Sequence, residues 1–515
     1  MGNALFDAIK ETDNLTETTN GMAAWKSTLN AVLDLFAKGA SYRKNPNGIR
    51  TMVRSAWLED KLSTVRCLFY LRDIRGNGGQ GEREVFRKGI HEVATLEPKT
   101  FINSNIISHI PTYGRWDDLF CLFGVHDDLD KQIIQFIIEQ LKSDITNYKS
   151  DKPISIMAKW LPSVNASSKR TRLYGKMLCK ELGVTEKHYR KTLSMLRKRI
   201  NILETYLTNK DYTFDYNEVP SNANMKYRKC FHEKDGERYR AHIDAVSKAI
   251  ERGDTNCKEA KVNVKTLYPY EIVNKFFDNS LYKSAFYKSE ENQLDNMWRS
   301  LPDYFGDAAH KNWLAVVDTS GSMTWGDNPK PIGVAISLGM YVAEHNKGVF
   351  KNKFITFESN PHLIEFDDKW DVGKKVHHIA SAPWGGSTNL IATFELVLNA
   401  AKRHNLPAEE MPEAIVIISD MQFDACVYGG NNEAAYDRIR TMYSCAGYRV
   451  PKLVFWNAAQ RDYGNLPVTQ HQYGAVLVGG CKPGMFEQIL SGKTPADFML
   501  QVLNGERYSA ITLAE

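Results

Sequence analysis

Apolar positions in the first 300 residues recur at intervals of three and four, the spacing of one face of an α-helix. The pattern predicts helices over Asn20–Ala37, Leu58–Leu71, Val85–Ala94, Leu129–Leu141 and Tyr189–Leu207. Alternating β-branched runs are almost absent from this half. Successive helices of similar length joined by short polar loops favour an α-helical array with a HEAT-like repeat architecture, although no sharp sequence repeat is present.

The pattern changes class at about residue 312, where short strand-like runs begin to alternate with helices. Strands are predicted at Leu314–Val317, Lys353–Phe357, Ala414–Ile418, Lys452–Trp456 and Ala475–Val478. Helices are predicted at Ile332–His345, Asn389–His404, Glu433–Tyr443 and Met485–Ser491. This alternation predicts a doubly wound, Rossmann-like α/β domain with a parallel sheet. We therefore expect a helical domain over residues 1–304 and an α/β domain over residues 305–515.

The composition narrows the class of protein. A hydrophobic content of 43% and an aromatic content of 11% indicate a folded chain, and 515 residues require more than one core. The eight cysteines are scattered without a Cys-x-x-Cys pair, which argues against a zinc site of the usual spacing and for a reducing compartment. The sequence has no signal-peptide pattern and no apolar run near the ~18 residues of a membrane helix, so we expect a soluble, cytoplasmic protein.

Positive charge gathers in one region, although the net charge of the chain is only +5. Residues 151–210 hold fourteen Lys and Arg against four Asp and Glu. Such a run is commonly a solvated helix face. Here Trp160, Ser167 and Ser168 are interleaved, and this mixture suits single-stranded nucleic acid, whose bases stack and whose phosphates pair with cations. Core packing is the competing interpretation of Trp160. The candidate RNA-binding residues are Lys159, Lys169, Arg170, Arg172, Lys187, Arg190, Lys191, Arg197, Lys198 and Arg199.

The segment RDIRGNGGQGER contains a glycine pattern, because Gly76, Gly78 and Gly81 fit G-x-G-x-x-G. The segment before it is helical rather than a strand, and no Gly-Lys-Ser/Thr follows. A glycine-rich turn between helices is therefore favoured over a phosphate-binding loop. Arginine forms paired hydrogen bonds with phosphate oxygens, so three side chains near the turn remain candidates for such contacts: Arg72, Arg75 and Arg83.

The segment IPTYGRWDDLF carries two adjacent acids, Asp117 and Asp118. An acid/base pair is one interpretation. Capping of a helix start is favoured, because carboxylates in a first turn stabilise the positive end of the helix dipole.

Hard oxygen groups gather after the first predicted strand, in WLAVVDTSGSM. Asp318, Ser320 and Ser322 stand at alternate positions there, and such ligands suit Mg²⁺, Mn²⁺ or Ca²⁺. The carboxyl ends of parallel strands meet at one edge of a sheet. We therefore expect the loops that hold Thr388 and Asp420 to approach the same point. A hydrolase triad is disfavoured because G-x-S-x-G is not met, whereas a phosphoryl-transfer nucleophile at Asp318 stays open.

These five residues resemble the metal-ion-dependent adhesion site of von Willebrand factor A domains, in which Asp-x-Ser-x-Ser is followed by a Thr and then an Asp. The resemblance implies that Ser320, Ser322 and Thr388 bind a metal directly, and that Asp318 and Asp420 bind it directly or through water. Ser387 is the alternative to Thr388. Such a site leaves a coordination position open to an acidic or phosphate group of a partner. This predicts binding rather than turnover, so we expect no enzymatic activity.

A helical half followed by a von Willebrand A domain resembles the TROVE/Ro family, and the phrases IPTYGRWDDLF and AKWLPS carry the likeness. The phrases LRDIRGNGGQGEREVFRK, YRKTLSMLRKRI and VPSNANMKY resemble a Ro-like family without a settled activity. The Ro resemblance implies a ring that holds single-stranded RNA ends, with structured non-coding RNA on an outer basic surface. The alternative is a metal-dependent protein-binding adaptor or a structural protein that binds no RNA. Neither hypothesis involves a membrane.

Overall fold

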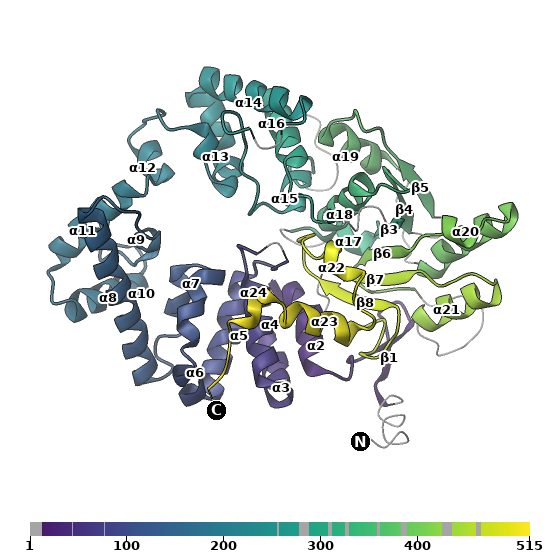
Figure 1. The fold of residues 1–515 in the computed structure, drawn as a ribbon, viewed down its shortest axis with the longest axis horizontal. Coiled ribbons are helices and arrows are strands. Elements are labelled where there is room, and N and C mark those ends of the chain that lie inside the picture. The colour runs from purple at the N-terminus through teal and green to yellow at the C-terminus, as the bar shows by residue number, and fades with distance from the viewer. Residues whose placement is uncertain are drawn as a thin grey trace.

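The helical half forms an arc whose two ends both meet the α/β half, so that the chain closes on itself (Figure 1). The computed structural model describes residues 13–43, 45–76, 78–254, 257–277, 288–306, 312–324, 329–357, 361–382, 389–424, 435–459 and 465–514. Among the helices of these residues, none combines the length and apolarity needed to cross a membrane.

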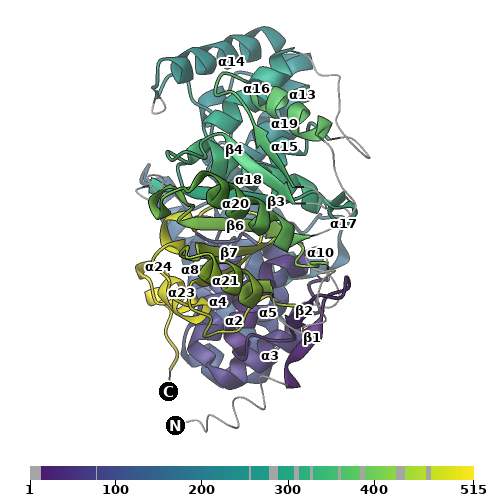
Figure 2. The ribbon, with the colours of Figure 1, turned by 90° about the vertical axis from the view of Figure 1, so that its right-hand side faces the viewer.

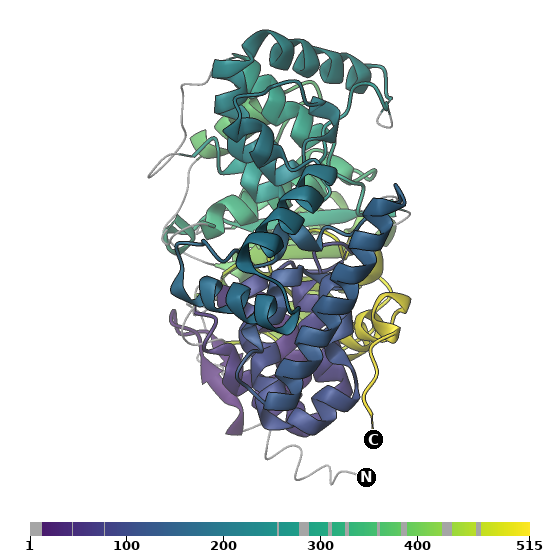
Figure 3. The ribbon, with the colours of Figure 1, turned by 90° about the vertical axis from the view of Figure 1, so that its left-hand side faces the viewer.

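The arc is built from helices of 4 to 23 residues, most of which pack against helices close to them in the chain. Its first part comprises α2 (Ala31–Lys38), α3 (Ile49–Glu59), α4 (Lys61–Arg72), α5 (Arg83–Leu96), α6 (Pro98–Asn103), α7 (Ile110–Tyr113) and α8 (Asp127–Lys149). Its second part comprises α9 (Met157–Trp160), α10 (Lys169–Glu181), α11 (Glu186–Arg199), α12 (Leu203–Thr208), α13 (Ser221–Lys234), α14 (Gly236–Glu251), α15 (Pro269–Val273) and α16 (Lys288–Arg299). Figure 3 shows the middle of the arc, in blue, from outside.

The predicted helix over Asn20–Ala37 is wrong in its first half. A hairpin of β1 (Leu15–Glu17) and β2 (Ala23–Trp25) stands there, and α2 begins only after Asn30, whose side chain accepts a hydrogen bond from the Leu33 N–H. The apolar side chain of Met22 is buried against the sheet domain rather than in the helical array. Apolar residues in this segment are spaced as in a helix, but Met22 is buried by residues of the α/β half. The spacing alone did not predict this long-range contact.

Two other predicted helices are broken by their own capping residues. Asp60 lies between α3 and α4, and its side chain accepts a hydrogen bond from the Ser63 N–H. Asn201 has a φ of +49°, so the helix predicted to run to Leu207 ends at Arg199. The predictions over Val85–Ala94 and Leu129–Leu141 are confirmed as parts of α5 and α8.

All five predicted strands are present. The six-stranded sheet consists of β3 (Trp313–Asp318), β4 (Lys353–Phe357), β5 (His362–Glu365), β6 (Ala414–Ser419), β7 (Lys452–Asn457) and β8 (Ala475–Gly479). Its order is β5-β4-β3-β6-β7-β8. The sheet is mixed rather than purely parallel, because β5 pairs antiparallel with β4. Only one of its four residues, Ile364, is buried, which is why this edge strand has no apolar run to predict it.

The sheet lies between two apolar clusters, and alternate residues of each strand belong to each. Leu314 and Val316 of β3 pack in the cluster that includes α20 (Leu390–His404) and α21 (Ala435–Cys445). These helices cover the face turned to the viewer in Figure 2. Ala315 and Val317 belong to the other cluster, which includes α18 (Pro331–His345) and continues into the helical arc. The sheet and the arc therefore share one core.

Each end of the chain packs against the opposite half of the protein. The last helices are α22 (Phe486–Ile489), α23 (Pro495–Leu503) and α24 (Glu506–Ser509), and α23 and α24 contact α4. Arg507 of α24 donates two hydrogen bonds to the buried Asp73 carboxylate, at 2.7 and 3.0 Å. At the other end of the chain, Trp25 of β2 pairs with Leu466 of the α/β half. The remaining elements are α17 (Gly321–Thr324) and α19 (Val372–Ser381).

Candidate functional site

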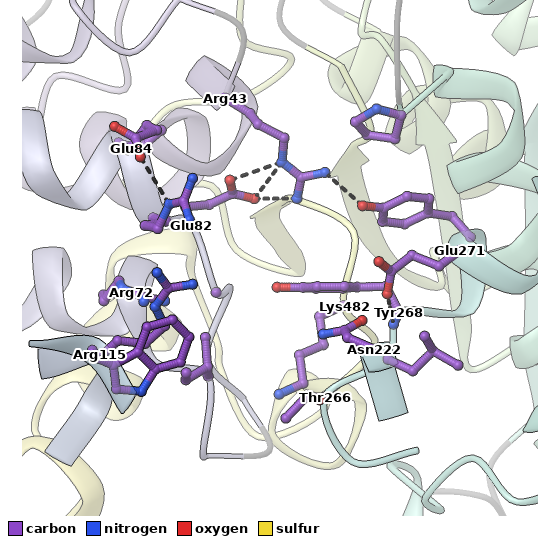
Figure 4. A pocket seen from close by; sticks show the side chains of 18 residues that line it. Arg43, Arg72, Glu82, Glu84, Arg115, Asn222, Thr266, Tyr268, Glu271 and Lys482 are labelled. Atoms are coloured by element: carbon purple, nitrogen blue, oxygen red, sulfur yellow. Dashed lines mark hydrogen bonds and ion pairs between the residues drawn. The ribbon is translucent and has the colours of Figure 1, made fainter. Parts of the chain in front are cut away.

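A cavity of about 680 Å³ lies where the start of the arc, its later part and the α/β half meet. Figure 4 shows side chains converging on it from the first helices on one side and from the segment around α15 on the other. Its walls combine cationic, acidic and aromatic side chains. The lining residues are Arg43, Arg72, Ile74, Gly81, Glu82, Arg83, Glu84, Val85, Arg115, Trp160, Asn222, Thr266, Leu267, Tyr268, Tyr270, Glu271, Pro329 and Lys482.

The glycine-rich segment forms one wall of this cavity. It connects α4 to α5, so the predicted turn between helices is confirmed. Gly81 has a φ of +73°, and a Cβ there would lie 1.9 Å from the hydroxyl oxygen of Tyr268. The same hydroxyl donates a hydrogen bond of 2.6 Å to the Gln80 carbonyl, so the close approach joins the start of the arc to α15. Gly81 is required here both by its backbone angle and by its neighbour.

The arginines of the wall are all paired with carboxylates. Arg43 bonds to Glu82 and donates a 3.2 Å hydrogen bond to the Tyr270 hydroxyl. The buried Arg72 lies 2.7 Å from Asp118, and Arg83, which is about half exposed, lies 2.9 Å from Glu84. Arg72 is therefore held in the wall, whereas Arg83 remains accessible.

The two acids of IPTYGRWDDLF begin a 3-10 helix, Trp116–Cys121, as the capping interpretation predicted. The Asp118 carboxylate accepts a hydrogen bond of 2.9 Å from the Arg115 N–H. Both acids also bind arginines, which the sequence pattern did not reveal: Arg87 lies 2.8 Å from Asp118, and the Arg115 side chain donates to Asp117 at 2.7 Å. Burial alone would raise the pKa of Asp117, but the hydrogen bonds and charges of Arg115 and Arg87 lower it.

Lys482 differs from these arginines because no carboxylate forms an ion pair with it among the described residues. Its side chain is 6% exposed, and its ammonium donates a hydrogen bond of 2.8 Å to the Gly76 carbonyl. Burial lowers the pKa of this lysine to about 8. An anion in the cavity would offset that loss of hydration.

Trp160 provides an aromatic surface among the residues that line the cavity. The guanidinium of Arg115 lies 3.8 Å from the centre of its ring, and the Lys159 ammonium lies 5.6 Å from it. The side chain is half buried, packs against the main apolar cluster and lines the cavity. Trp160 therefore packs against the core with part of its side chain and presents another part to the cavity.

The ten predicted RNA-binding cations fall into two sets. The first set is exposed and forms no ion pair among the described residues: Lys169, Lys187, Arg190, Lys191 and Lys198. They lie on α10 and α11, far from the sheet along the arc (Figure 1). Lys180 of α10 shares these properties and was not among the ten candidates, although it lies within the basic region of residues 151–210.

The second set is engaged within the protein. Arg197 donates to the carbonyls of Ala158 and Leu161, at 2.8 and 3.1 Å, and Arg172 donates to those of Ala166 and Ser167, at 2.7 Å each. The remaining three contact side chains: Lys159 pairs with Glu204, Arg199 with Asp151, and Arg170 donates to the Tyr174 hydroxyl. These five have structural roles, and their contact with RNA stays a prediction.

The strand-end site forms at the carboxyl ends of β3 and β6, which are adjacent and parallel. Asp318 accepts hydrogen bonds from the Ser320 N–H at 2.9 Å and from the Ser419 hydroxyl at 2.6 Å. The hydroxyl oxygens of Ser320 and Ser322 lie 3.0 Å apart. Burial, and then the charge of Asp420, raise the pKa of Asp318 to about 7. Thr388 and Ser387 lie outside the described residues.

This donor set fits a hard divalent cation. Two buried carboxylates repel one another there, and no basic side chain pairs with Asp318 among the described residues. A bound cation would relieve that repulsion, and the hydroxyls of Ser320 and Ser322 supply further oxygen ligands. Nowhere among the described residues, this site included, do three His, Cys, Asp or Glu side chains come together, so the strand-end site relies on two carboxylates and on hydroxyls.

Comparison with known proteins places the chain in a family. Residues 18–122 and 124–310 match a family model described as a domain of unknown function, DUF2828. The chain belongs to the DUF2828 family. Residues 312–504 match a second domain of unknown function, DUF7788. "Uncharacterized protein L728" of Acanthamoeba polyphaga mimivirus is 30% identical over 524 residues, which covers 95% of this chain and 87% of that protein.

Among solved structures, the chain is similar to the crystal structure of the Deinococcus radiodurans Ro (RSR) protein. The alignment covers 92% of this chain and 93% of that one, with 13% identity and a TM-score of 0.35. A score of this size does not establish a common fold. The resemblance to the Ro family, and to a von Willebrand A domain in particular, therefore stays a prediction.

Proposed function

We propose that this protein binds single-stranded RNA, with unpaired nucleotides in the cavity and the neighbouring phosphates on α10 and α11. The observation that carries the proposal is the composition of the cavity wall, which combines the Lys482 ammonium, paired with no carboxylate of the described residues, with accessible aromatic and guanidinium surfaces. Each nucleotide of a single strand offers a flat base and a charged phosphate, so a site for it needs stacking surfaces and cations together. The role is binding, not catalysis.

The stacked pair of Arg115 and Trp160 is suited to a base. Its two flat groups are already in contact at 3.8 Å, and Asp117 fixes the guanidinium from the side. A base added to such a stack has little side-chain entropy to remove, because the pair is ordered beforehand. Lys482 and Arg83 are the cations that would meet phosphate oxygens within the same cavity. Its volume of about 680 Å³ lies in the usual range of ligand pockets.

Helix α11, which carries several of the exposed cations, is hydrogen-bonded to the helix that places Trp160 in the cavity wall. Trp160 lies on α9, and Arg197 of α11 holds α9 through the carbonyls of Ala158 and Leu161. Lys187, Arg190 and Lys191 are exposed on that same helix. An RNA strand with one base stacked on Trp160 can therefore continue from α9 along α11. The two helices are hydrogen-bonded together and α11 carries exposed cations, which supports this path for the RNA backbone.

The experiment is a titration of fluorescent single-stranded RNA against the full chain at several salt concentrations. Replacing Lys187, Arg190 and Lys191 by Glu should weaken binding and reduce the slope of log affinity against log salt by roughly 2, because each phosphate contact to a single strand contributes about 0.7. The matched control replaces three equally exposed cations elsewhere, Lys248, Lys402 and Arg403, by Glu. Equal affinities of both variants and the unaltered protein would refute the assignment of α11.

The strand-end site favours a second function, metal-dependent capture of a partner. We propose that Asp318, Ser320, Ser322 and Asp420 hold Mg²⁺, with Mn²⁺ or Ca²⁺ as alternatives, and that Thr388 completes the set as the family resemblance implies. When bound, the ion would supply an electrophilic position for a carboxylate or phosphate of a partner. The supporting observation is the pair of buried, mutually repelling carboxylates beside two hydroxyls. Partner capture that needs the metal but is indifferent to the cations of α11 would favour this adaptor function over RNA binding.

A further inference from the structure

The loop that carries Asp420 is shaped by hydrogen bonds to the strand-end site itself. The Gln422 N–H donates to the Asp420 carboxylate at 3.2 Å, and the Met421 N–H donates to the Ser419 hydroxyl at 3.0 Å. That hydroxyl in turn donates to Asp318. Met421 has a φ of +64°, a conformation that L residues rarely adopt, so surrounding contacts must hold it. The positions of the two acids therefore depend on residues 419–422.

The turn of the N-terminal hairpin holds the same loop from its other side. The Thr18 hydroxyl donates a buried hydrogen bond of 2.6 Å to the Phe423 carbonyl. The Thr19 N–H donates to the Gln422 side chain at 2.8 Å, and the Asn20 side chain donates to the Gln422 carbonyl at 2.9 Å. These contacts join segments about 400 residues apart in the chain.

Two further contacts complete this junction. Gly21 and Asp424 form an antiparallel bridge, and Met22 packs in one apolar cluster with Met421 and Phe423. In Figure 2 the hairpin lies on the same side of the molecule as α17, which carries Ser322. The hairpin thus contacts residues 422–424 directly and shares an apolar cluster with Met421.

The hairpin depends on this docking for its own order. Its strands are three residues each, and an isolated two-stranded hairpin of that size is at best marginally stable in water. Its other attachment is also to the α/β half, where Trp25 and Leu466 exchange two backbone hydrogen bonds of 2.9 Å and the Asn465 side chain donates to the Glu17 carbonyl. Docking of the hairpin and the geometry of the Asp420 loop are therefore one coupled arrangement.

We infer that the N-terminal hairpin is a built-in support of the metal site, in which Thr18 and Asn20 act as positioning residues that set Asp420 through Gln422 and Phe423. The inference rests on the proposed metal site and is independent of RNA binding. Groups that orient metal ligands commonly change metal affinity by about 10- to 100-fold. Because coupling between two sites is reciprocal, a bound metal should stabilise the docked hairpin by the same factor.

The first test measures Mn²⁺ affinity by calorimetry on the full chain. Thr18→Val removes the hydroxyl with little change of shape and should weaken Mn²⁺ binding by about 10- to 100-fold, whereas Thr18→Ser should restore it. The matched control is Thr64→Val, which also removes a buried hydroxyl: the Thr64 hydroxyl in α4 donates a hydrogen bond of 2.6 Å to the carbonyl of Asp60, the residue before that helix. Unchanged Mn²⁺ affinity in Thr18→Val, or an equal loss in Thr64→Val, would overturn the inference.

The second test measures the effect of the bound metal on the hairpin, by amide hydrogen exchange in the unaltered protein. Saturating Mg²⁺ should slow exchange at the paired amides of Thr19 and Trp25, while amides of α8 should not respond. If Mg²⁺ binds but the amide exchange rates in the hairpin stay unchanged, the inference is overturned. A protein that binds neither ion overturns the metal assignment together with the inference, and leaves the RNA titration to decide the first proposed function.

Discussion

The cavity and the strand-end site are assembled in different ways. At the strand-end site, Asp318, Ser320 and Ser322 come from five consecutive positions, and Asp420 follows the neighbouring parallel strand. The cavity instead takes residues from the whole length of the chain, from Arg43 to Lys482. The charges of the two sites also differ: four arginines of the cavity wall pair with carboxylates, whereas at the strand-end site burial and then the charge of Asp420 raise the pKa of Asp318.

The charges and shapes of the two sites indicate which class of ligand each can bind. Buried like charges beside hydroxyls call for a small cation. A wall of paired arginines, aromatic rings and the Lys482 ammonium, which forms an ion pair with no carboxylate of the described residues, suits a larger ligand with flat faces and modest negative charge. Metal binding and RNA binding should therefore be separable by substitution.

The largest expected effect is at the strand-end site. Asp318→Ala should lower Mn²⁺ affinity by more than about 100-fold, because it removes a charged ligand at the centre of the donor set. Thermal unfolding checks this, since Mg²⁺ should raise the Tm of the unaltered protein and not that of the variant. RNA affinity should stay unchanged. A large loss of RNA affinity would show that the two sites are not separable.

The next effect is expected at the cavity. Trp160→Ala should weaken single-stranded RNA binding by about 5- to 150-fold, the range for loss of one stacked base. The control is Trp370→Ala, because Trp370 is also half buried and carries a cation, Lys374, at 4.4 Å from its ring centre. Fluorescence anisotropy distinguishes the two. Similar losses in both variants would point to general destabilisation instead.

A smaller effect should appear in the pH dependence of RNA binding. Lys482 has a pKa lowered by burial to about 8, so it is charged at pH 7 and loses its proton as the pH rises through 8. RNA affinity should therefore fall several-fold between about pH 7 and pH 9. Lys482→Met should bind more weakly at pH 7 and lose this dependence. A profile with the same shape in both proteins would remove Lys482 from the site.

The smallest effect is expected where the two ends of the chain meet. Arg507→Ala should lower the free energy of unfolding by about 1 kcal/mol, because Arg507 is partly exposed although its partner Asp73 is buried. Arg440→Ala is the control, since its 3.9 Å pair with Asp437 is long and exposed. Denaturant titration compares them. A larger loss for Arg507→Ala would indicate that the contact also keeps the glycine-rich wall of the cavity in place.

Local patterns in the sequence were sufficient for most of the α/β half. Five strands and helix α18 were predicted because continuous apolar runs and helical spacing are short-range signals, and both faces of this sheet are buried. The proximity of Asp318 and Asp420 also followed, since adjacent parallel strands end at one edge. The edge strand β5 was missed because three of its four residues are exposed.

The remaining features depend on contacts between distant segments, which local sequence patterns do not reveal. The spacing of Met22 and Trp25 is helical, yet both residues contact the α/β half, which begins nearly 300 residues later. Arg197 and Lys191 look equivalent in a basic run, but one binds buried carbonyls while the other is exposed. The physical reason is the same in each case: composition and periodicity report which face of an element is apolar, and not which distant segment will cover it. The cavity, its paired arginines and the docked hairpin all depend on such long-range partners.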